Sequence, residues 1–421
     1  MPPNGLGRRK LENFIDTFID ATANLGTPKI FRRWTAISII AAALEQKVWI
    51  ISGRRPLHPN LYIFLIAHPG VGKTRTINEG RRLCGDLPEF HLAPVSMTFA
   101  SLVDALLLAE RKLIRQPEGT ITYNSMYICA DELGAFVHKY DPEMTNGLSA
   151  FYDPTPYQQT RRGTQGHGID IQIPSPQLNI LAGSTPQNLM GFMPDTAWGQ
   201  GFSSRIIMVF SDERIQVDDF ADFGPPRTAE LVHDLKIIND LYGEFTITAP
   251  YKEAVNDWRA HDEKPIPAHP RLIHYIVRRR VNIYKLSMIA SIAVNNSLVL
   301  TEKNFFTGLE WLLQAENFME DIFKAGAVNA DASAMDEIQH FIMVSDFGTG
   351  VAERRIVNFA RERIPISSIL NVIKVMEGAG QIKCVRRDKA TNERFFSSMT
   401  LQSPGQPTDR SLKTILKSVI Q

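Results

Sequence analysis

The sequence predicts a parallel α/β fold. Three uncharged, mostly apolar runs have the length of strands buried on both faces, and they span residues 61–66, 126–130 and 178–182. Patterns typical of helices lie between these runs, one after Lys73 and another over residues 100–114. Strands that alternate with helices in this way indicate a parallel sheet, in which ligands bind near the carboxyl ends of the strands.

The composition is that of an ordinary globular protein. The 421 residues correspond to about two or three domains. Hydrophobic residues make up 44% and charged residues 22%, which excludes a mostly disordered or collagen-like chain. The 46 Lys and Arg residues nearly balance the 45 Asp and Glu residues, so a surface for nucleic acid must be a local patch. The sequence has no secretion signal or membrane-spanning run, and its three cysteines are far apart. We therefore expect a cytoplasmic protein with no membrane partner.

Changes in composition divide the chain into five predicted segments. A helical N-terminal segment over residues 1–52 precedes the α/β core, which is expected over residues 53–225. A helical block with few glycines follows over residues 226–325. A basic module is predicted over residues 334–400, and a tail over residues 401–421.

A glycine-rich loop follows the strand at residues 61–66. Residues 67–74 read Ala-His-Pro-Gly-Val-Gly-Lys-Thr and resemble the P-loop motif G-x-x-x-x-G-K-[ST], with Ala67 in place of the first glycine. Gly70 and Gly72 allow a tight turn whose backbone N–H groups face a phosphate, and the next helix adds its positive N-terminal dipole. The alternative is a glycine-rich turn that arose by chance, which the strand before it and the helix after it disfavour.

The P-loop resemblance implies contacts with ATP and Mg²⁺. Lys73 would reach the β- and γ-phosphates, and the Thr74 hydroxyl would ligate Mg²⁺. The residues predicted to contact the nucleotide from this loop are Pro69, Gly70, Val71, Gly72, Lys73, Thr74 and Arg75.

An acidic pair follows the strand at residues 126–130. Asp131 and Glu132 are expected at its carboxyl end, where α/β proteins hold their ligands. Asp131 would hold Mg²⁺, in part through water, and Glu132 would orient and deprotonate an attacking water. The pair thus favours hydrolysis over phosphoryl transfer to a small acceptor. Without the glycine-rich loop at residues 67–74, the acidic pair would be equally consistent with solvent-exposed residues at the start of a helix.

Polar residues also follow the strand at residues 178–182. This segment, residues 184–188, would lie between the ends of the other two strands and contact the γ-phosphate or the water. Thr185 is the preferred candidate and Asn188 the second. The alternative is that Thr185 serves as a helix N-cap before Pro186.

Arg205 stands directly before a further buried strand, which ends at residue 210. Its distance from the preceding strand is typical of an arginine finger, which stabilises charge on a γ-phosphate across a subunit boundary. The alternative is a surface salt bridge. If Arg205 acts as a finger, the active protein is an oligomer.

These elements occur in the order seen in AAA+ ATPases. Ser204-Arg205-Ile206 before a strand resembles the minichromosome-maintenance type of helicase, and residues 58–62 and 201–205 resemble helicase-like ATPases of phage and mobile-element replication. The resemblance covers roughly residues 30–320. It implies a P-loop NTPase core with a helical lid, and a lid arginine that senses nucleotide, for which Arg279 is the first choice. A solvated basic helix face is the alternative for Arg279.

The resemblance also implies a DNA-binding hairpin over residues 157–171. Its extended arms flank glycines and basic residues, and in the helicase branch such a hairpin projects into the channel of a ring. Arg161 and Arg162 would then hold DNA phosphates. The alternative is an exposed surface loop.

The predicted C-terminal module is strongly basic. Residues 354–394 contain ten Lys and Arg residues against four Asp and Glu residues, a net charge of +6. An amphipathic helix over residues 366–376 precedes two predicted strands joined by a basic turn, a pattern that resembles a winged helix. The candidate DNA contacts are Lys383, Arg386, Arg387 and Lys389. Winged helices also dock proteins, and that alternative stays open.

Together these observations lead us to expect an ATP-dependent DNA helicase or translocase of replication that works as a homo-hexameric ring. A separate primase is a possible partner, because no primase signature is present. One alternative is a loader or transposition-helper ATPase that assembles on DNA without unwinding it. Another is an initiator that uses ATP only to assemble.

Overall fold

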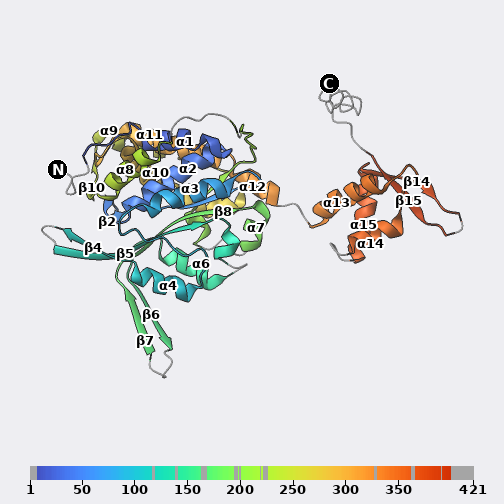
Figure 1. Cartoon of the computed structure of the whole chain (residues 1–421), viewed down its shortest axis with the longest axis horizontal. Coiled ribbons are helices and arrows are strands. Elements are labelled where there is room, and N and C mark those ends of the chain that lie inside the picture. Colours follow the sequence, from blue (N-terminus) through green and yellow to red (C-terminus); the bar gives the residue numbers. More distant parts are fainter. Residues whose placement is uncertain are drawn as a thin grey trace. The chain divides into compact units, whose positions relative to one another are not determined.

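The structure is a computed structural model that describes residues 7–115, 119–137, 141–162, 168–193, 198, 201–218, 220, 226–326, 330–361, 366–389 and 391–399. The chain forms two compact units, Met1–Gly326 and Ala327–Gln421, and each is described by itself. Figure 1 shows the elements of both units. Within the ranges given, no helix is both long and apolar enough to cross a bilayer.

A five-stranded sheet forms the centre of the first unit. Its strand order is β4 (Glu110–Arg115), β5 (Gly119–Ala130), β8 (Pro176–Ser184), β3 (Tyr62–Ile66) and β9 (Ile206–Phe210). The last four strands run parallel, and β4 pairs antiparallel with β5. Every residue of β3, β8 and β9 is buried, as expected for strands covered on both faces. The prediction of an α/β fold with a parallel sheet is confirmed.

Helices lie on both faces of this sheet (Figure 1). On one face are α2 (Lys29–Leu44), an almost wholly buried helix, and α3 (Lys73–Gly85), which follows β3. On the other are α4 (Phe99–Leu108) and α6 (Pro142–Ala150). Side chains cap both of these helices: Thr98 accepts a hydrogen bond from Ser101 N, and Asp141 from Met144 N.

The prediction of a helix over residues 100–114 is wrong in its second half. α4 ends at Leu108, and β4 follows it as an edge strand. The reason lies in β5, which is 12 residues long and pairs with β8 along one edge only. Its opposite edge is open, and the backbone of β4 pairs with that edge over Gly119–Asn124.

A two-stranded hairpin extends away from the rest of the unit (Figure 1). It consists of β6 (Tyr157–Arg162) and β7 (Gly168–Ile173), paired antiparallel from Tyr157 with Ile173 to Arg162 with Gly168. The predicted hairpin is thus present. Residues 163–167 between its strands lie outside the described residues.

Helices also make up the end of the first unit, as the sequence predicts. They are α8 (Thr228–Asn239), α9 (Ala249–Ala260), α10 (Ile273–Val294), α11 (Glu302–Glu316) and α12 (Met319–Gly326). α10 packs against α11, against α2 and against a short 3-10 turn, η3 (Ser203–Arg205). The helices therefore share one hydrophobic core with the sheet.

The remaining elements of this unit are short and lie around the same core. They are α1 (Phe14–Ala21), η1 (Ala23–Leu25), β1 (Val48–Ser52), β2 (Arg55–Leu57), α5 (Leu133–Phe136), α7 (Pro186–Phe192), β10 (Gly243–Glu244), β11 (Thr246–Ile247), η4 (Pro270–Leu272) and β12 (Val299–Leu300). β1 pairs with β10 and β2, so the N-terminal segment joins the helical block through β10.

Over the residues that the structure describes, the second unit combines three helices with a small sheet. Its elements are α13 (Ala330–Ser345), β13 (Val351–Ala352), α14 (Glu353–Ala360), α15 (Ile366–Gly378), β14 (Ile382–Arg387) and β15 (Arg394–Ser398). The strands are antiparallel in the order β13-β15-β14. Buried side chains from all three helices, among them Ile338, Ile356 and Ile373, form a separate core. The predicted helix and both predicted strands are present.

Candidate functional site

A loop curls around the ammonium group of Lys73 at the carboxyl end of β3. Lys73 is the first residue of α3, and its Nζ donates hydrogen bonds to Ala67 O at 2.7 Å and His68 O at 3.2 Å. Gly70 and Gly72 have φ values of 88° and 91°, which favour glycine. A Cβ on Gly72 would lie 2.7 Å from Thr27 Cγ2, so only glycine fits this turn.

The start of α3 is free of side-chain capping. Gly72 occupies its N-cap position and supplies no side-chain acceptor, which leaves the first-turn N–H groups available to an anion. Thr74 and Arg75 are exposed beside it, and Arg75 Nη1 donates to Leu25 O at 3.0 Å. The exposed Pro69 and Gly70 and the buried Val71 complete the loop. The geometry suits an anion with several oxygens.

Burial lowers the pKa of Lys73, and the charges of Glu132 and Asp212 oppose that shift. Desolvation is the largest cause, because the side chain is enclosed by its own loop. An anion that binds next to this ammonium therefore adds a favourable electrostatic interaction to those of Glu132 and Asp212.

The acidic pair lies at the carboxyl end of β5. β8 separates β5 from β3 in the sheet, so the three strand ends are neighbours, as the sequence predicts. A Cβ on Gly183 of β8 would lie 2.4 Å from Asp131 O, and glycine therefore permits this close approach. Asp131 Oδ1 is 3.3 Å from Arg81 Nη2 of α3. The same Nη2 donates to Cys129 O.

Of the two candidates after β8, Asn188 is the one that reaches the acidic pair. Its Nδ2 donates a hydrogen bond of 3.0 Å to Glu132 Oε1. Thr185 is the N-cap of α7, and its Oγ1 accepts from Asn188 N at 3.2 Å. Thr185 thus performs the structural role that the sequence left open, and it positions the turn that carries Asn188.

Two partners of this site were not predicted. Arg81 lies eight residues after Lys73 on α3 and pairs with Asp131. Asp212 follows β9 and accepts from His68 N at 3.1 Å, with His68 Nδ1 at 2.8 Å from the same oxygen. A signal for Asp212 was present in the sequence, since it stands two residues after a buried strand and resembles the pattern that pointed to Asp131.

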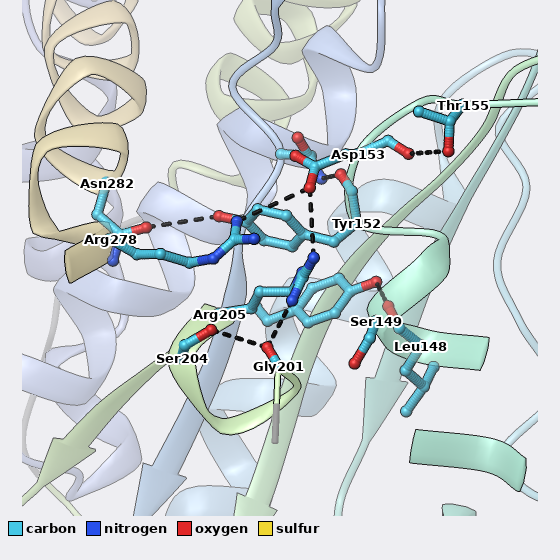
Figure 2. Close-up of polar contacts among 12 residues, drawn as sticks. Leu148, Ser149, Tyr152, Asp153, Thr155, Gly201, Ser204, Arg205, Arg278 and Asn282 are labelled. Atoms are coloured by element: carbon cyan, nitrogen blue, oxygen red, sulfur yellow. Dashed lines mark hydrogen bonds and ion pairs between the residues drawn. The ribbon is translucent and has the colours of Figure 1, made fainter. Parts of the chain in front are cut away.

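Arg205 lies at the other end of the sheet. Ile206 pairs in register with Tyr62, the first residue of β3, whereas the loop around Lys73 begins after Ile66, the last residue of that strand. A strand of this length spans about 13 Å, so Arg205 is remote from the loop of its own chain. Its guanidinium donates to Gly201 O at 2.5 Å and lies 3.4 Å from Asp153 Oδ2 (Figure 2).

The assignment of Arg279 to nucleotide sensing is contradicted. Arg279 is fully buried, and its guanidinium lies 2.7 Å from both carboxylate oxygens of Glu316. It also donates to Glu263 O at 2.6 Å and to Pro265 O at 2.7 Å. With its donors used inside the helical block, Arg279 is a structural residue.

Comparison of the chain with models of known protein families and with curated proteins finds no match. The chemistry of the site is therefore inferred from its residues and their geometry.

The predicted DNA contacts differ in their accessibility. Arg161 Nη1 pairs with Asp104 of α4 at 2.8 Å, and Nη2 donates to Ala100 O at 3.0 Å. The side chain of Arg162 lies outside what the structure describes. Four cations of the second unit are exposed on β14 and the turn after it: Lys383, Arg386, Arg387 and Lys389.

Proposed function

We propose that this chain hydrolyses ATP with Mg²⁺ at the carboxyl ends of β3, β8 and β5. The observation that carries the proposal is the loop of residues 67–72 around Lys73 at an uncapped helix start, next to strand ends that carry Asp131 and Glu132. In this account the loop is a P-loop in which Ala67 replaces a glycine, and ATP is the substrate.

The residues present fit a magnesium ion. The exposed hydroxyl of Thr74 and the half-exposed carboxylate of Asp131 are hard oxygen donors, and Mg²⁺ usually takes few protein ligands and keeps several waters. Bound there, Mg²⁺ would neutralise charge on the phosphate oxygens. The release of Asp131 from Arg81 would leave both of its oxygens for the ion and its waters.

The catalytic roles follow from position. Lys73 and the N–H groups of the loop stabilise charge on the terminal phosphate. Glu132 accepts a proton from the attacking water, and Asn188 orients Glu132 through the hydrogen bond of 3.0 Å. The amide of Asn188 keeps a second N–H and its oxygen for the water itself.

The leading proposal for the use of this energy is an ATP-driven DNA helicase or translocase that acts as a hexameric ring. The hairpin of β6 and β7 and the cations of β14 support it as DNA contacts, and the second unit has the element order of a winged helix. Arg205 supports the ring, because it lies at the opposite end of the sheet from its own loop and would complete the site of a neighbour.

A specific observation favours the loader or helper ATPase as a second candidate. The guanidinium of Arg161 is held by Asp104 and Ala100 of its own chain, so the hairpin offers this arginine to DNA only after those contacts break. A loader needs the nucleotide site and the ring interface, but it does not need Arg161 to hold a DNA strand.

Steady-state ATPase assays with and without single-stranded DNA test the proposal. Lys73→Ala should abolish turnover, whereas Lys112→Ala, an exposed lysine on β4, should leave it unchanged. Undiminished turnover in Lys73→Ala would refute the site. Strand displacement from a forked duplex that disappears in Glu132→Gln supports the helicase. ATP turnover without any displacement by the wild-type protein supports the loader.

A further inference from the structure

An open pocket lies between β1 and the helical block of the first unit. Its volume is about 340 Å³, and none of the described residues that line it belongs to the candidate ATP site. Residues 50–53 of β1 and the turn after it form one wall, and α9 forms the other. Each wall is roughly 10–12 Å long, so the pocket is long enough for several residues of an extended chain.

The centre of the pocket is apolar. Its buried lining residues include Ile50 of β1 and Val255 of α9. Ile51 also lines the pocket and is 46% exposed, although it is a large aliphatic residue in a strand. Apolar surface that stays open beside a buried floor is typical of a site that a partner covers. The pocket therefore favours an apolar side chain at its centre.

The rim of the pocket carries positive charge without a counter-charge. Lys252 and Arg259 are exposed on α9 and line the pocket. Among the residues that the structure describes, neither side chain has an ion-pair partner, and no carboxylate lines the pocket. Glu253 and Asp257 of the same helix lie outside its lining. Two unpaired cations beside an apolar floor complement a partner that carries carboxylates next to an apolar side chain.

β1 also leaves one backbone edge open at the pocket. Among the described strands, β10 pairs with β1 only as far as Trp49, whereas β2 pairs with residues 50–52 along the other edge. Trp49 O accepts a hydrogen bond of 2.8 Å from Phe245 N on the β10 edge, so the N–H and C=O of Ile51, two residues later, point to that same edge. Pro56 lies opposite Ile51 on β2 and has no N–H, which is consistent with this register. Ile51 thus presents a donor and an acceptor beside the pocket.

These features fit an extended peptide better than a nucleic acid. Single-stranded nucleic acids bind through bases that stack on exposed aromatic side chains. Two tyrosines line the pocket, but Tyr251 is 3% exposed and Tyr284 is half-buried. A peptide, by contrast, pairs with a strand edge through its backbone and directs alternate side chains to one face.

We propose that this pocket binds an extended segment of a partner protein, which adds to the edge of β1 at Ile51. An apolar side chain of the segment packs on Val255, and carboxylates two residues before and after it meet Lys252 and Arg259. The two cations lie about 10 Å apart along α9, and carboxylates four residues apart in a strand lie about 13 Å apart. The long cationic side chains span this difference. The inference does not depend on the proposed ATP hydrolysis.

Fluorescence anisotropy with a labelled peptide tests the proposal on the full chain. The probe is Ser-Asp-Thr-Phe-Thr-Asp-Ser, in which the Phe and both Asp side chains share one face of an extended chain. It should bind with a dissociation constant of about 10–100 µM. Lys252→Glu and Arg259→Glu each reverse a charge at the rim, and each should weaken binding about tenfold. Lys303→Glu, an exposed residue of α11 outside the pocket, is the matched control with unchanged binding.

N-methylated peptides test the addition to β1 separately from the charges. Alternate residues of a strand direct their N–H groups to opposite edges, so methylation of one alternate set should abolish binding. Methylation of the other set should leave the affinity within about twofold of the parent peptide. Equal effects of the two sets would overturn strand addition.

The remaining outcomes decide which occupant the pocket takes. No binding of the probe, or binding that neither Lys252→Glu nor Arg259→Glu weakens, would overturn the proposal. Binding of a thymidine oligonucleotide that both variants lose would assign the pocket to nucleic acid instead. Self-association of the wild-type chain that both variants lose would assign it to an interface between copies.

Discussion

Asn188 and Glu132 are joined by a hydrogen bond of 3.0 Å although 56 residues separate them in the chain. The sheet order brings them together, because β8 lies between β5 and β3 and its end carries the turn of Asn188. A carboxylate oriented by an amide is prepared to hold a water in one direction. This pair is the part of the candidate site that positions the water rather than the nucleotide.

Asn188→Ala should lower kcat about 10- to 100-fold and change KM little, because Glu132 keeps its charge but loses its orientation. Steady-state kinetics over a range of ATP concentrations measure this. Gln187→Ala, an exposed neighbour on the same turn, is the control. A rise in KM with unchanged kcat would instead assign Asn188 to ground-state binding.

The lowered pKa of Lys73 predicts that ATP binding takes up protons. A lysine whose pKa is reduced by burial loses its charge at lower pH than the ordinary value of 10.5, so the affinity for ATP should fall as the pH rises through that lowered pKa. The bound phosphates favour the charged form and raise the pKa again. Calorimetric titrations with a non-hydrolysable ATP analogue measure this proton uptake. They are carried out at alkaline pH in two buffers of different ionisation enthalpy.

A Lys73→Arg variant controls for this effect, since arginine keeps its charge throughout. Its analogue binding should show no proton uptake and a flat pH dependence. An equally steep dependence in both proteins would show that another group titrates.

Arg279→Ala should destabilise the first unit by about 3–5 kcal/mol, because it leaves Glu316 buried without its cation. Urea unfolding followed by intrinsic fluorescence measures the loss. Arg280→Ala, whose side chain is 44% exposed, should change the free energy of unfolding by less than about 0.5 kcal/mol. If Arg279→Ala instead weakens ATP binding while stability is unchanged, its structural assignment is refuted.

Replacement of Lys383, Arg386, Arg387 and Lys389 by alanine should weaken DNA binding and its dependence on salt. Each phosphate contact to single-stranded DNA contributes about 0.7 to the slope of log K against log salt, so four contacts should reduce that slope by nearly 3. Fluorescence anisotropy with a labelled oligonucleotide at several salt concentrations measures it. A double Lys252→Ala and Lys303→Ala variant in the first unit is the control. An unchanged slope in the fourfold variant would favour the second unit as a protein-docking module.

The sequence predicted those features that local pattern determines. Buried strands such as β3 and β8 stand out as apolar runs, and the loop before Lys73 and the pair after β5 follow from their position relative to those strands. The central position of β8 also followed, because polar residues were expected between the ends of the two other strands. In the second unit, the helical spacing of apolar residues over residues 366–376 was enough to predict α15.

Features that depend on tertiary packing were not predicted. Three adjacent arginines look alike in the sequence, yet Arg278 reaches Asp153, Arg279 is buried with Glu316, and Arg280 pairs with Glu263. Only the packing of α10 against α11 and η3 distinguishes them. β4 was missed for a similar reason, since its charged sequence becomes a strand only because β5 offers it a free edge.

The release of phosphate from ATP already bound to the protein tests the central claim most directly. In a single-turnover experiment, wild type and Glu132→Gln are loaded with ATP, and Mg²⁺ is then added. We predict that both proteins bind the nucleotide equally well and that Glu132→Gln releases phosphate at least about 100-fold more slowly. Equal rates of release would contradict the account, because the carboxylate that Asn188 orients would then have no part in hydrolysis.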